Sequence, residues 1–210
     1  MIHFRDHENQ RLVLVSDQTN QGVLGGTPWE HSLVPQRYGM TGLGPVRFTV
    51  PDSQPTKRIL TEVLGFRRVG SYQPFEQGQS EVEVFDTGEG GTGAEVHVEE
   101  RQDLKQKEKP GRGSVHHVAF RVEDRAALEK WRDRIRQERL PNSGVVERHY
   151  FQSLYFREPN GILIELATDG PGFATDEDEK HLGEQLALPP FLEEKRDEIE
   201  ANLKPIQYKP

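Results

Sequence analysis

The chain has 210 residues, with 27 Lys and Arg against 35 Asp and Glu and a formal net charge of −8 at pH 7. This acidic balance argues against a phosphate-binding surface, so we expect no nucleic-acid partner. The absence of cysteine excludes disulfides, thiolate metal sites and a cysteine nucleophile, and it fits a cytoplasmic protein. No apolar run approaches the roughly 18 residues of a membrane span, so we expect no membrane partner. The charged opening MIHFRDHENQ lacks an apolar h-region, so we expect no secretory signal.

The first predicted elements repeat a pattern found near the other end of the chain. Residues 3–16 and residues 155–168 both show an aromatic strand end, a polar turn and an apolar strand. We therefore expect residues 1–16 to be the end of an incomplete strand–helix–three-strand module. Residues 17–42, rich in Gly, Gln and Ser, are expected to be a connector. The matched positions are Phe4 with Phe156, Leu12 with Ile164, and Leu14 with Leu166.

Residues 43–100 are predicted to form one complete module of this kind. The expected elements are a strand at 43–50, a helix near 54–63 ended by Gly65, and strands near 66–72, 81–85 and 94–99. The charged stretch at 101–113 is expected to be a loop.

Residues 114–168 repeat the same plan. Asp124 is a plausible N-cap for a helix that carries Leu128, Trp131 and Ile135 at helical spacing. The expected strands are 114–122, 145–150, 153–156 and 161–167. Residues 169–210 are predicted to be a helical tail, with short helices near 176–186 and 190–203.

Two polar residues of this last module are expected to converge. Strand alternation places His117 away from the helix-facing Val118, and it places Glu165 away from Ile164. If the sheet curls, both polar side chains enter its concave side. An imidazole and a carboxylate are two thirds of the two-His-one-carboxylate triad that holds Fe(II). From spacing alone, a pair of surface or hydrogen-bonded histidines remains the alternative.

Longer segments resemble a known superfamily. The repeated module, the HHVAF opening, VLGF at 63–66 and FREPNGILIEL at 156–166 resemble the glyoxalase, bleomycin-resistance and extradiol-dioxygenase (vicinal oxygen chelate) superfamily. GLGPVRFTV, GTGAEVHVE, SLYFREPNGILIELATDGPGFATDE and LALPPFLE are similar to hydroquinone-type ring-cleaving dioxygenases of bacteria, and the resemblance covers essentially the whole chain. It implies an α+β fold of repeated βαβββ modules in curved mixed sheets, incomplete at the N-terminus.

The resemblance also implies roles for individual residues. His117 and Glu165 match metal ligands, His116 matches a residue that hydrogen-bonds substrate or a reduced oxygen intermediate, and Arg148 and Tyr155 match the substrate pocket. The implied reaction is cleavage of a hydroquinone- or catechol-like ring by O2 at Fe(II), with Mn(II) as the alternative metal. A hairpin that pairs residue 157 with residue 163 would place Tyr155 opposite Glu165, whereas a one-residue slip would turn it away.

The third ligand of the family is not found in this sequence. In the relatives it comes from an HHIT-like stretch near the N-terminus, while here Pro45 falls on His117 and Val13 falls on Glu165. His97 also aligns with Glu165, and we interpret it as a remnant or a structural residue. Three hypotheses follow: a fragment that lacks N-terminal modules, a homodimer whose partner supplies the ligand, or a non-catalytic protein that binds small aromatics.

Overall fold

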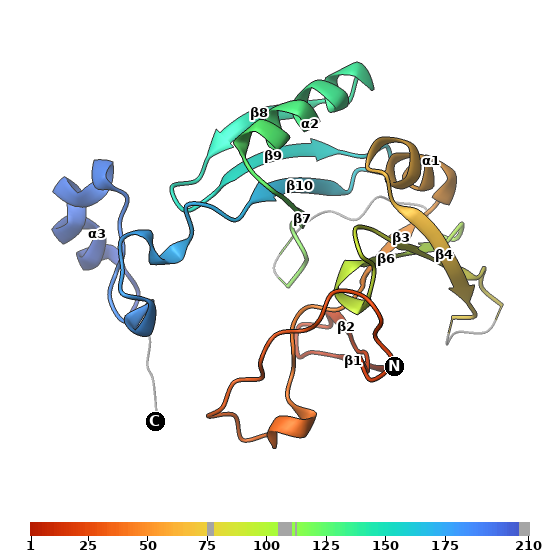
Figure 1. Ribbon diagram of the computed structural model, residues 1–210, viewed down its shortest axis with the longest axis horizontal. Helices are drawn as coiled ribbons and strands as arrows, with labels where there is room; N and C mark the ends of the chain where they lie inside the picture. The colour runs from red at the N-terminus through yellow and green to blue at the C-terminus, as the bar shows by residue number, and fades with distance from the viewer. Residues whose placement is uncertain (75–77, 105–110, 112, 206–210) are drawn as a thin grey trace.

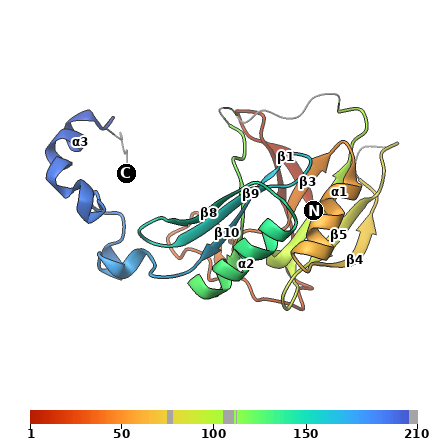
Figure 2. The same ribbon diagram turned by 90° about the horizontal axis from the view of Figure 1, so that it is seen from above.

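The computed structural model describes residues 1–74, 78–104, 111 and 113–205. Within these residues the chain forms two four-stranded sheets, each covered by a helix, and a separate two-stranded hairpin (Figure 1). A C-terminal segment extends away from the sheets and ends in helix α3 (Arg196–Asn202), as two perpendicular views show (Figures 1 and 2). No helix of the described part is long and apolar enough to cross a membrane.

The first sheet has the strand order β3-β6-β5-β4, with β3 parallel to β6 and the other neighbours antiparallel. Its helix begins as α1 (Ser53–Arg58) and continues as a π-helical segment over Ile59–Val63. The helix ends before Gly65, whose φ of +77° favours glycine. The strands are β3 (Val46–Val50), β4 (Arg67–Tyr72), β5 (Val82–Asp86) and β6 (Glu95–Glu100).

The second sheet has the equivalent order β7-β10-β9-β8, and again only the first and last strands of the module are parallel. Helix α2 (Arg125–Gln137) connects the first two strands, and the Asp124 carboxylate accepts a 2.8 Å hydrogen bond from the Ala127 amide. The N-cap prediction and the strand–helix–three-strand repeat are therefore confirmed. The strands are β7 (Val118–Val122), β8 (Asn142–Glu147), β9 (Gln152–Arg157) and β10 (Leu163–Thr168).

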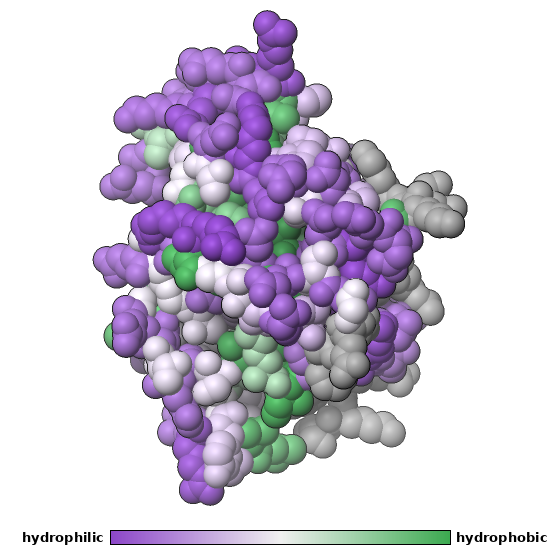
Figure 3. All heavy atoms as spheres, turned by 90° about the vertical axis from the view of Figure 1, so that its right-hand side faces the viewer, coloured by the Kyte–Doolittle hydropathy of each residue, from purple (hydrophilic) through white to green (hydrophobic). Residues whose placement is uncertain are grey.

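The two modules share one hydrophobic core. The Phe66 ring of the first module meets the Phe120 ring of the second edge to face, at 5.2 Å between centroids. A buried polar contact adds to this core, because the Thr56 hydroxyl donates a 2.7 Å hydrogen bond to the Glu158 carboxylate. The surface in Figure 3 is mostly hydrophilic with small separate apolar areas, in keeping with the charge-rich composition.

The N-terminal hairpin of β1 (Ile2–Arg5) and β2 (Arg11–Leu14) has the same register as β9 and β10. Its Phe4 pairs with Leu12 just as Phe156 pairs with Ile164, which agrees with the predicted sequence repeat. The environments differ, because α2 helps to bury the apolar face of β9 and β10 whereas every residue of β1 and β2 is exposed. That residues 1–16 close an incomplete module stays a prediction.

The opening strands start later than predicted. β3 begins at Val46 rather than at residue 43, and β7 begins at Val118 rather than at residue 114. Pairing with β6 starts at Val46, and pairing with β10 starts at Val118, so the preceding residues have no neighbour in the ladder. His116 and His117 therefore lie just before the strand rather than inside it.

Two further predictions were wrong. β8 covers 142–147 instead of 145–150, because a bulge between Asn142 and Val145, with Gly144 at φ +69°, keeps the turn-like residues in the sheet. The expected helix near 176–186 is only a 3-10 turn at Glu179–His181, since this short acidic stretch has no apolar surface to pack on and is interrupted by Gly183 at φ +78°. The second expected tail helix is present as a 3-10 turn at Pro190–Lys195 followed by α3.

The division of the chain at residues 16, 42, 100, 113 and 168 stays a prediction. The connector at 17–42 contains one short 3-10 turn, Gln36–Tyr38, as its regular element. The predicted loop at 101–113 includes residues 105–110 and 112, which lie outside the described part of the chain. The same holds for residues 206–210 of the predicted tail.

Candidate functional site

His117 and Glu165 meet on the side of the second sheet that faces away from α2. The His117 Nε2 atom is 2.8 Å from the Glu165 Oε2 atom. The Glu165 side chain is only 4% exposed, whereas the His117 side chain is 35% exposed. The carboxylate is thus buried, whereas the imidazole beside it is partly exposed to solvent.

Strand geometry explains this convergence. Glu165 lies on β10 between Ile164 and Leu166, which are both buried in the core, so its side chain points to the opposite face. Its parallel neighbour on β7 is Ala119, whose small side chain leaves room above the sheet. His117 lies two residues before Ala119 and reaches Glu165 although it precedes the strand.

Tyr155 lies directly opposite Glu165 in the antiparallel pair of β9 and β10. This is the register predicted from the hairpin, and the alternative one-residue slip is excluded. The Tyr155 ring lies 5.8 Å from the His117 ring in an edge-to-face arrangement. The Arg148 guanidinium carbon is 5.2 Å from the centre of the Tyr155 ring. An imidazole and a phenol therefore lie beside the buried carboxylate, and the Arg148 cation lies against the phenol ring.

His116 completes this group. Its Nδ1 atom is 2.9 Å from the Nδ1 atom of His117, and the two rings are perpendicular. A hydrogen bond between two imidazoles needs one N–H and one free nitrogen. When the proton of His117 is on Nε2, beside the Glu165 carboxylate, the Nδ1 atom of His117 accepts from His116. The structure thus brings together the five residues predicted for the site: His116, His117, Arg148, Tyr155 and Glu165.

Ser153 is a member of the site that the sequence reasoning missed. Its hydroxyl donates a short hydrogen bond to Oε1 of Glu165, and Ser153 is fully buried. Ser153 lies two residues before Tyr155 on β9 and so points to the same face. That alternation was the signal that could have found it. With Ser153 on Oε1 and His117 at Oε2, both oxygens of Glu165 are engaged.

The donor atoms suit part of a metal site. A converging imidazole nitrogen and carboxylate oxygen are ligands that Fe(II) and Mn(II) accept. Among the residues that the structure describes, no group of three or more His, Cys, Asp or Glu is arranged to hold a metal ion. Three further histidines, His31, His149 and His181, each contact a carboxylate outside this site. The described residues therefore place two donor types of the predicted triad, one imidazole and one carboxylate, side by side.

His97 occupies the position in the first sheet that Glu165 occupies in the second. Its register neighbour on β3 is Arg47, just as Ala119 is the neighbour of Glu165. The Tyr72 hydroxyl contacts His97 Nδ1 at 3.0 Å, and Glu95 contacts Nε2 at 3.0 Å. These partners lie on opposite sides of the ring. The contacts support a structural residue.

Burial affects the ionisation of this second cluster. Desolvation lowers the pKa of His97 below its ordinary value, although the neighbouring Glu95 acts in the other direction. Desolvation also raises the pKa of Tyr72, which keeps its hydroxyl protonated, while Arg47 donates a 2.8 Å hydrogen bond to the same oxygen. The result is a continuous polar chain from Arg47 through Tyr72 and His97 to Glu95.

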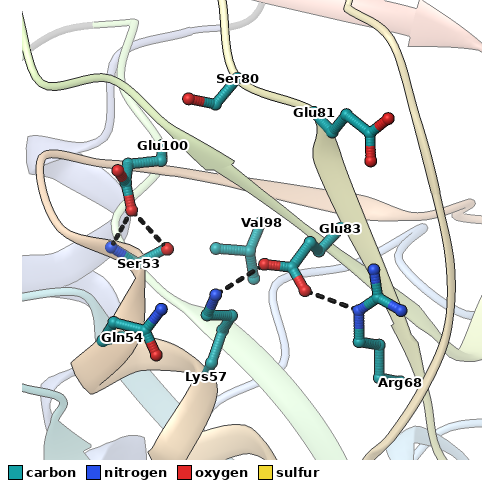
Figure 4. A pocket seen from close by; sticks show the side chains of 9 residues that line it. All are labelled: Ser53, Gln54, Lys57, Arg68, Ser80, Glu81, Glu83, Val98 and Glu100. Carbon is teal, nitrogen blue, oxygen red and sulfur yellow. Dashed lines mark hydrogen bonds and ion pairs between the residues drawn. The ribbon is translucent and has the colours of Figure 1, made fainter.

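A cavity of about 350 Å³ lies in the first module, away from the His117–Glu165 pair (Figure 4). Its central carboxylate, Glu83, accepts 2.6 Å hydrogen bonds from both Lys57 and Arg68. Burial alone would raise the pKa of Glu83, but these two cations lower it. Glu100 accepts from the amide and hydroxyl of Ser53 at the start of α1. Glu83 and Glu100 are thus already hydrogen-bonded within the protein, and the cavity is a weaker candidate for a ligand site than the His117–Glu165 pair.

Comparison with known proteins places the chain in a family. The model of the Glyoxalase/Bleomycin resistance protein/Dioxygenase superfamily matches residues 42–166. The chain belongs to this superfamily. Its described residues show the mixed curved sheets of that fold, and the α+β prediction is confirmed.

Several relatives carry dioxygenase names. The Bacillus subtilis (strain 168) protein named "Putative ring-cleaving dioxygenase MhqA" is 52% identical over 99% of this chain and 64% of its own length. A chlorohydroquinone/hydroquinone 1,2-dioxygenase of Sphingobium indicum is 28% identical over 82% of this chain and 52% of its own length. A crystal structure of a "putative dioxygenase" from Bacillus subtilis superimposes with a TM-score of 0.73 and 30% identity, covering 87% of this chain and 56% of that one. The chain thus spans about two thirds or less of each of these proteins.

Proposed function

We propose that the chain carries the site of a ring-cleaving dioxygenase that acts on hydroquinone- or catechol-like aromatics with O2. The observation that carries this proposal is the 2.8 Å approach of His117 to the buried Glu165, with Arg148 and Tyr155 beside them. The dioxygenase names of the relatives support the same reaction class. Because the chain spans only part of those relatives, activity of this chain by itself belongs to the proposal.

His117 Nε2 and Glu165 Oε2 would hold a divalent metal, Fe(II) or else Mn(II). When bound, such an ion supplies a Lewis acid with open positions for a substrate hydroxyl and O2. Ser153 holds Oε1 of the carboxylate and so directs Oε2 towards His117. His116 fixes the orientation of the His117 ring through its Nδ1 atom.

The remaining residues act on the substrate. The Arg148 guanidinium provides a positive charge for an ionised phenol oxygen and for the negative charge that develops as the ring opens. With His117 Nε2 on the metal, His117 Nδ1 would carry the proton that bonds His116 Nδ1, so His116 would present its Nε2–H as a hydrogen-bond donor to a substrate oxygen. The Tyr155 hydroxyl would supply a proton beside it. Protons are therefore supplied from the rim of the site, while the carboxylate at its base stays buried.

A second candidate function is supported by the incomplete ligand set. Two protein ligands hold Fe(II) more weakly than three, and among the described residues no group of three or more His, Cys, Asp or Glu could hold a metal ion. A non-catalytic protein that binds small aromatics would need only the concave surface, Tyr155 and Arg148. In the enzyme reading the third ligand comes from a second copy of the chain or from a module beyond the given sequence. Sedimentation of the metal-loaded protein separates a homodimer from a monomer.

The decisive experiment is anaerobic reconstitution with Fe(II), followed by metal analysis and O2 uptake with methylhydroquinone and catechol. Incorporation of both atoms of isotopically labelled O2 into a ring-opened product supports the dioxygenase. Saturable binding of the aromatics without retained metal or O2 uptake supports the binding protein instead. His117→Ala should abolish metal retention, and His31→Ala, at an exposed histidine far from the site, is the matched control. Unchanged iron content in His117→Ala refutes the metal assignment.

Three expectations from the sequence stay predictions. These are the cytoplasmic location and the lack of a nucleic-acid or membrane partner. Electrophoretic mobility shift with duplex DNA and vesicle co-sedimentation would test the two expected absences directly, because either partner would shift or pellet the protein.

A further inference from the structure

The turn that carries Arg148 has an unusual backbone conformation. Between β8 and β9, the Arg148 amide donates a 2.9 Å hydrogen bond to the Phe151 carbonyl, and the Tyr150 amide donates to the Arg148 carbonyl. His149, between them, has a φ of +68°. Residues other than glycine adopt this left-handed conformation at a cost, so surrounding contacts must hold it in place.

A segment beyond β10 supplies these contacts. The Asp176 Oδ2 atom lies 3.1 Å from His149 Nε2 and accepts a 3.1 Å hydrogen bond from the Tyr150 hydroxyl. The amide of Gly172 donates a 2.8 Å hydrogen bond to the Tyr150 carbonyl. The ring centroids of Tyr150 and Phe173 lie 5.3 Å apart. The turn is therefore held by one carboxylate, one backbone bond and one ring contact, all from residues 172–176.

Arg148 has few contacts of its own that could fix its position. Within the described residues its guanidinium makes no ion pair with a carboxylate, and its one ring contact is with Tyr155. A long side chain has several rotatable bonds, so the backbone at Arg148 sets which part of the surface its guanidinium can reach, and the Tyr155 ring holds it there. The adjoining residue, His149, is the one that Asp176 holds. The position of the guanidinium over Tyr155 therefore depends on this contact.

We propose that Asp176 is a positioning residue, which acts through His149 and Tyr150 to hold Arg148 at the rim of the His117–Glu165 site. This inference rests on the proposed function, since it deepens the role of Arg148 in binding the aromatic substrate. Asp176 is 27 residues from His149 in the sequence and lies in the tail, outside the modules that form the sheets. The tail segment thus takes part in shaping the site.

The test compares Asp176→Ala with Glu179→Ala in the full chain. Glu179 is exposed and lies three residues after Asp176. Glu179→Ala removes the same charge as Asp176→Ala without changing a residue that holds the turn between β8 and β9. The first measurement is the Arg148 Nε–Hε signal in an NMR spectrum, assigned with Arg148→Lys, because the nearby Tyr155 ring shifts this signal. Asp176→Ala should move or broaden the signal, and Glu179→Ala should leave it in place. An unchanged signal in Asp176→Ala overturns the proposal.

The second measurement is the dissociation constant of catechol, determined without O2. Loss of the positioning contact should weaken catechol binding by about tenfold in Asp176→Ala. In an Arg148→Ala background the same change should have no further effect, since there is no guanidinium left to position. An equal loss in both backgrounds overturns the proposal. Failure of wild-type protein to bind catechol contradicts the proposed function, while the NMR signal still decides the role of Asp176.

Replacing His149 tests the turn itself. His149→Asn keeps a side-chain N–H for Asp176 and tolerates a positive φ, so it should retain the Arg148 signal. His149→Val has neither property, because β-branched residues avoid this conformation, and it should displace the signal. A retained signal in His149→Val contradicts the proposed dependence on this turn.

Discussion

Thr56 and Glu158 are 102 residues apart in the sequence, and they form a hydrogen bond of 2.7 Å in the buried contact between the two modules. The other oxygen of Glu158 accepts a 2.9 Å hydrogen bond from the Ile162 amide. Asn160, in the same turn, donates both to Thr56 and to the carbonyl of Asp52. One turn of the second module thus bonds both the Thr56 hydroxyl and the Asp52 carbonyl at the start of the first helix.

Glu158→Ala should lower the free energy of unfolding by about 2–4 kcal/mol, because it leaves the Thr56 hydroxyl and the Ile162 amide without their buried partner. Urea denaturation followed by circular dichroism measures the effect. Glu123→Ala, at an exposed carboxylate of the second module, is the control and should change the value by less than about 0.5 kcal/mol. Equal stability of the two variants would show that the contact contributes little.

Ser153→Ala should weaken metal binding by about 10- to 100-fold. The substitution removes the hydroxyl that holds Oε1 of Glu165, so the carboxylate loses its fixed orientation towards His117. Anaerobic calorimetric titration with Fe(II) measures the change. The control is Ser71→Ala, which removes an exposed hydroxyl that donates a hydrogen bond to Glu81 in the first module. The Fe(II) affinity of this variant should match that of the wild type. Wild-type affinity in Ser153→Ala would contradict the assigned role.

Tyr155→Phe should lower kcat by about a hundredfold or more while changing KM little, because it keeps the ring beside His117 and removes the hydroxyl that returns a proton. Steady-state O2 uptake with methylhydroquinone separates the two constants. Tyr38→Phe, at a tyrosine that is 66% exposed, should have wild-type kinetics. A rise in KM with unchanged kcat in Tyr155→Phe would assign the hydroxyl to substrate binding alone.

His97 should make the stability of the protein depend on pH. Burial lowers its pKa below the ordinary value of 6.5, so at mildly acidic pH the unfolded chain binds a proton that the folded protein excludes. The free energy of unfolding should therefore be highest above about pH 6.5 and fall as the pH drops towards the lowered value. Denaturation series at about pH 7 and about pH 5 measure the slope.

His97→Gln should flatten this slope, because the replacement cannot take up a proton. His31→Gln, at a histidine whose side chain is 74% exposed, should retain it. An unchanged slope in His97→Gln would place the acid sensitivity in other groups.

The side of the sheet on which each polar residue lies could be predicted from the sequence, because strand alternation is a local property. Ile164 and Leu166 are buried and Glu165 points to the other face, as their pattern requires. His117 is next to Val118, so alternation directs the His117 side chain to the same face as Glu165. The convergence of His117 with Glu165 therefore followed from the two strand patterns together. The site residues themselves rested on the resemblance to a family.

Features that depend on distant partners were harder to predict. β7 starts where β10 can pair with it, and no residue near 114 indicates that starting point. The contact of Asp176 with His149 joins a turn to a tail, and nothing in either segment indicates the other. The predicted helix near 176–186 had helical composition but no surface to cover, and helices of this length need packing to be stable.

The hairpin of β1 and β2 has a consequence for local opening of the chain. Two strands whose side chains are all exposed gain little from burial, and an isolated hairpin is marginal in water. Its amides should therefore exchange with deuterium long before those of β9 and β10, although the two hairpins pair in the same register. The two hairpins would then have the same backbone pairing but different protection of their amides from exchange. Burial of the apolar face, rather than the hydrogen-bonded ladder itself, would therefore set how slowly each hairpin opens.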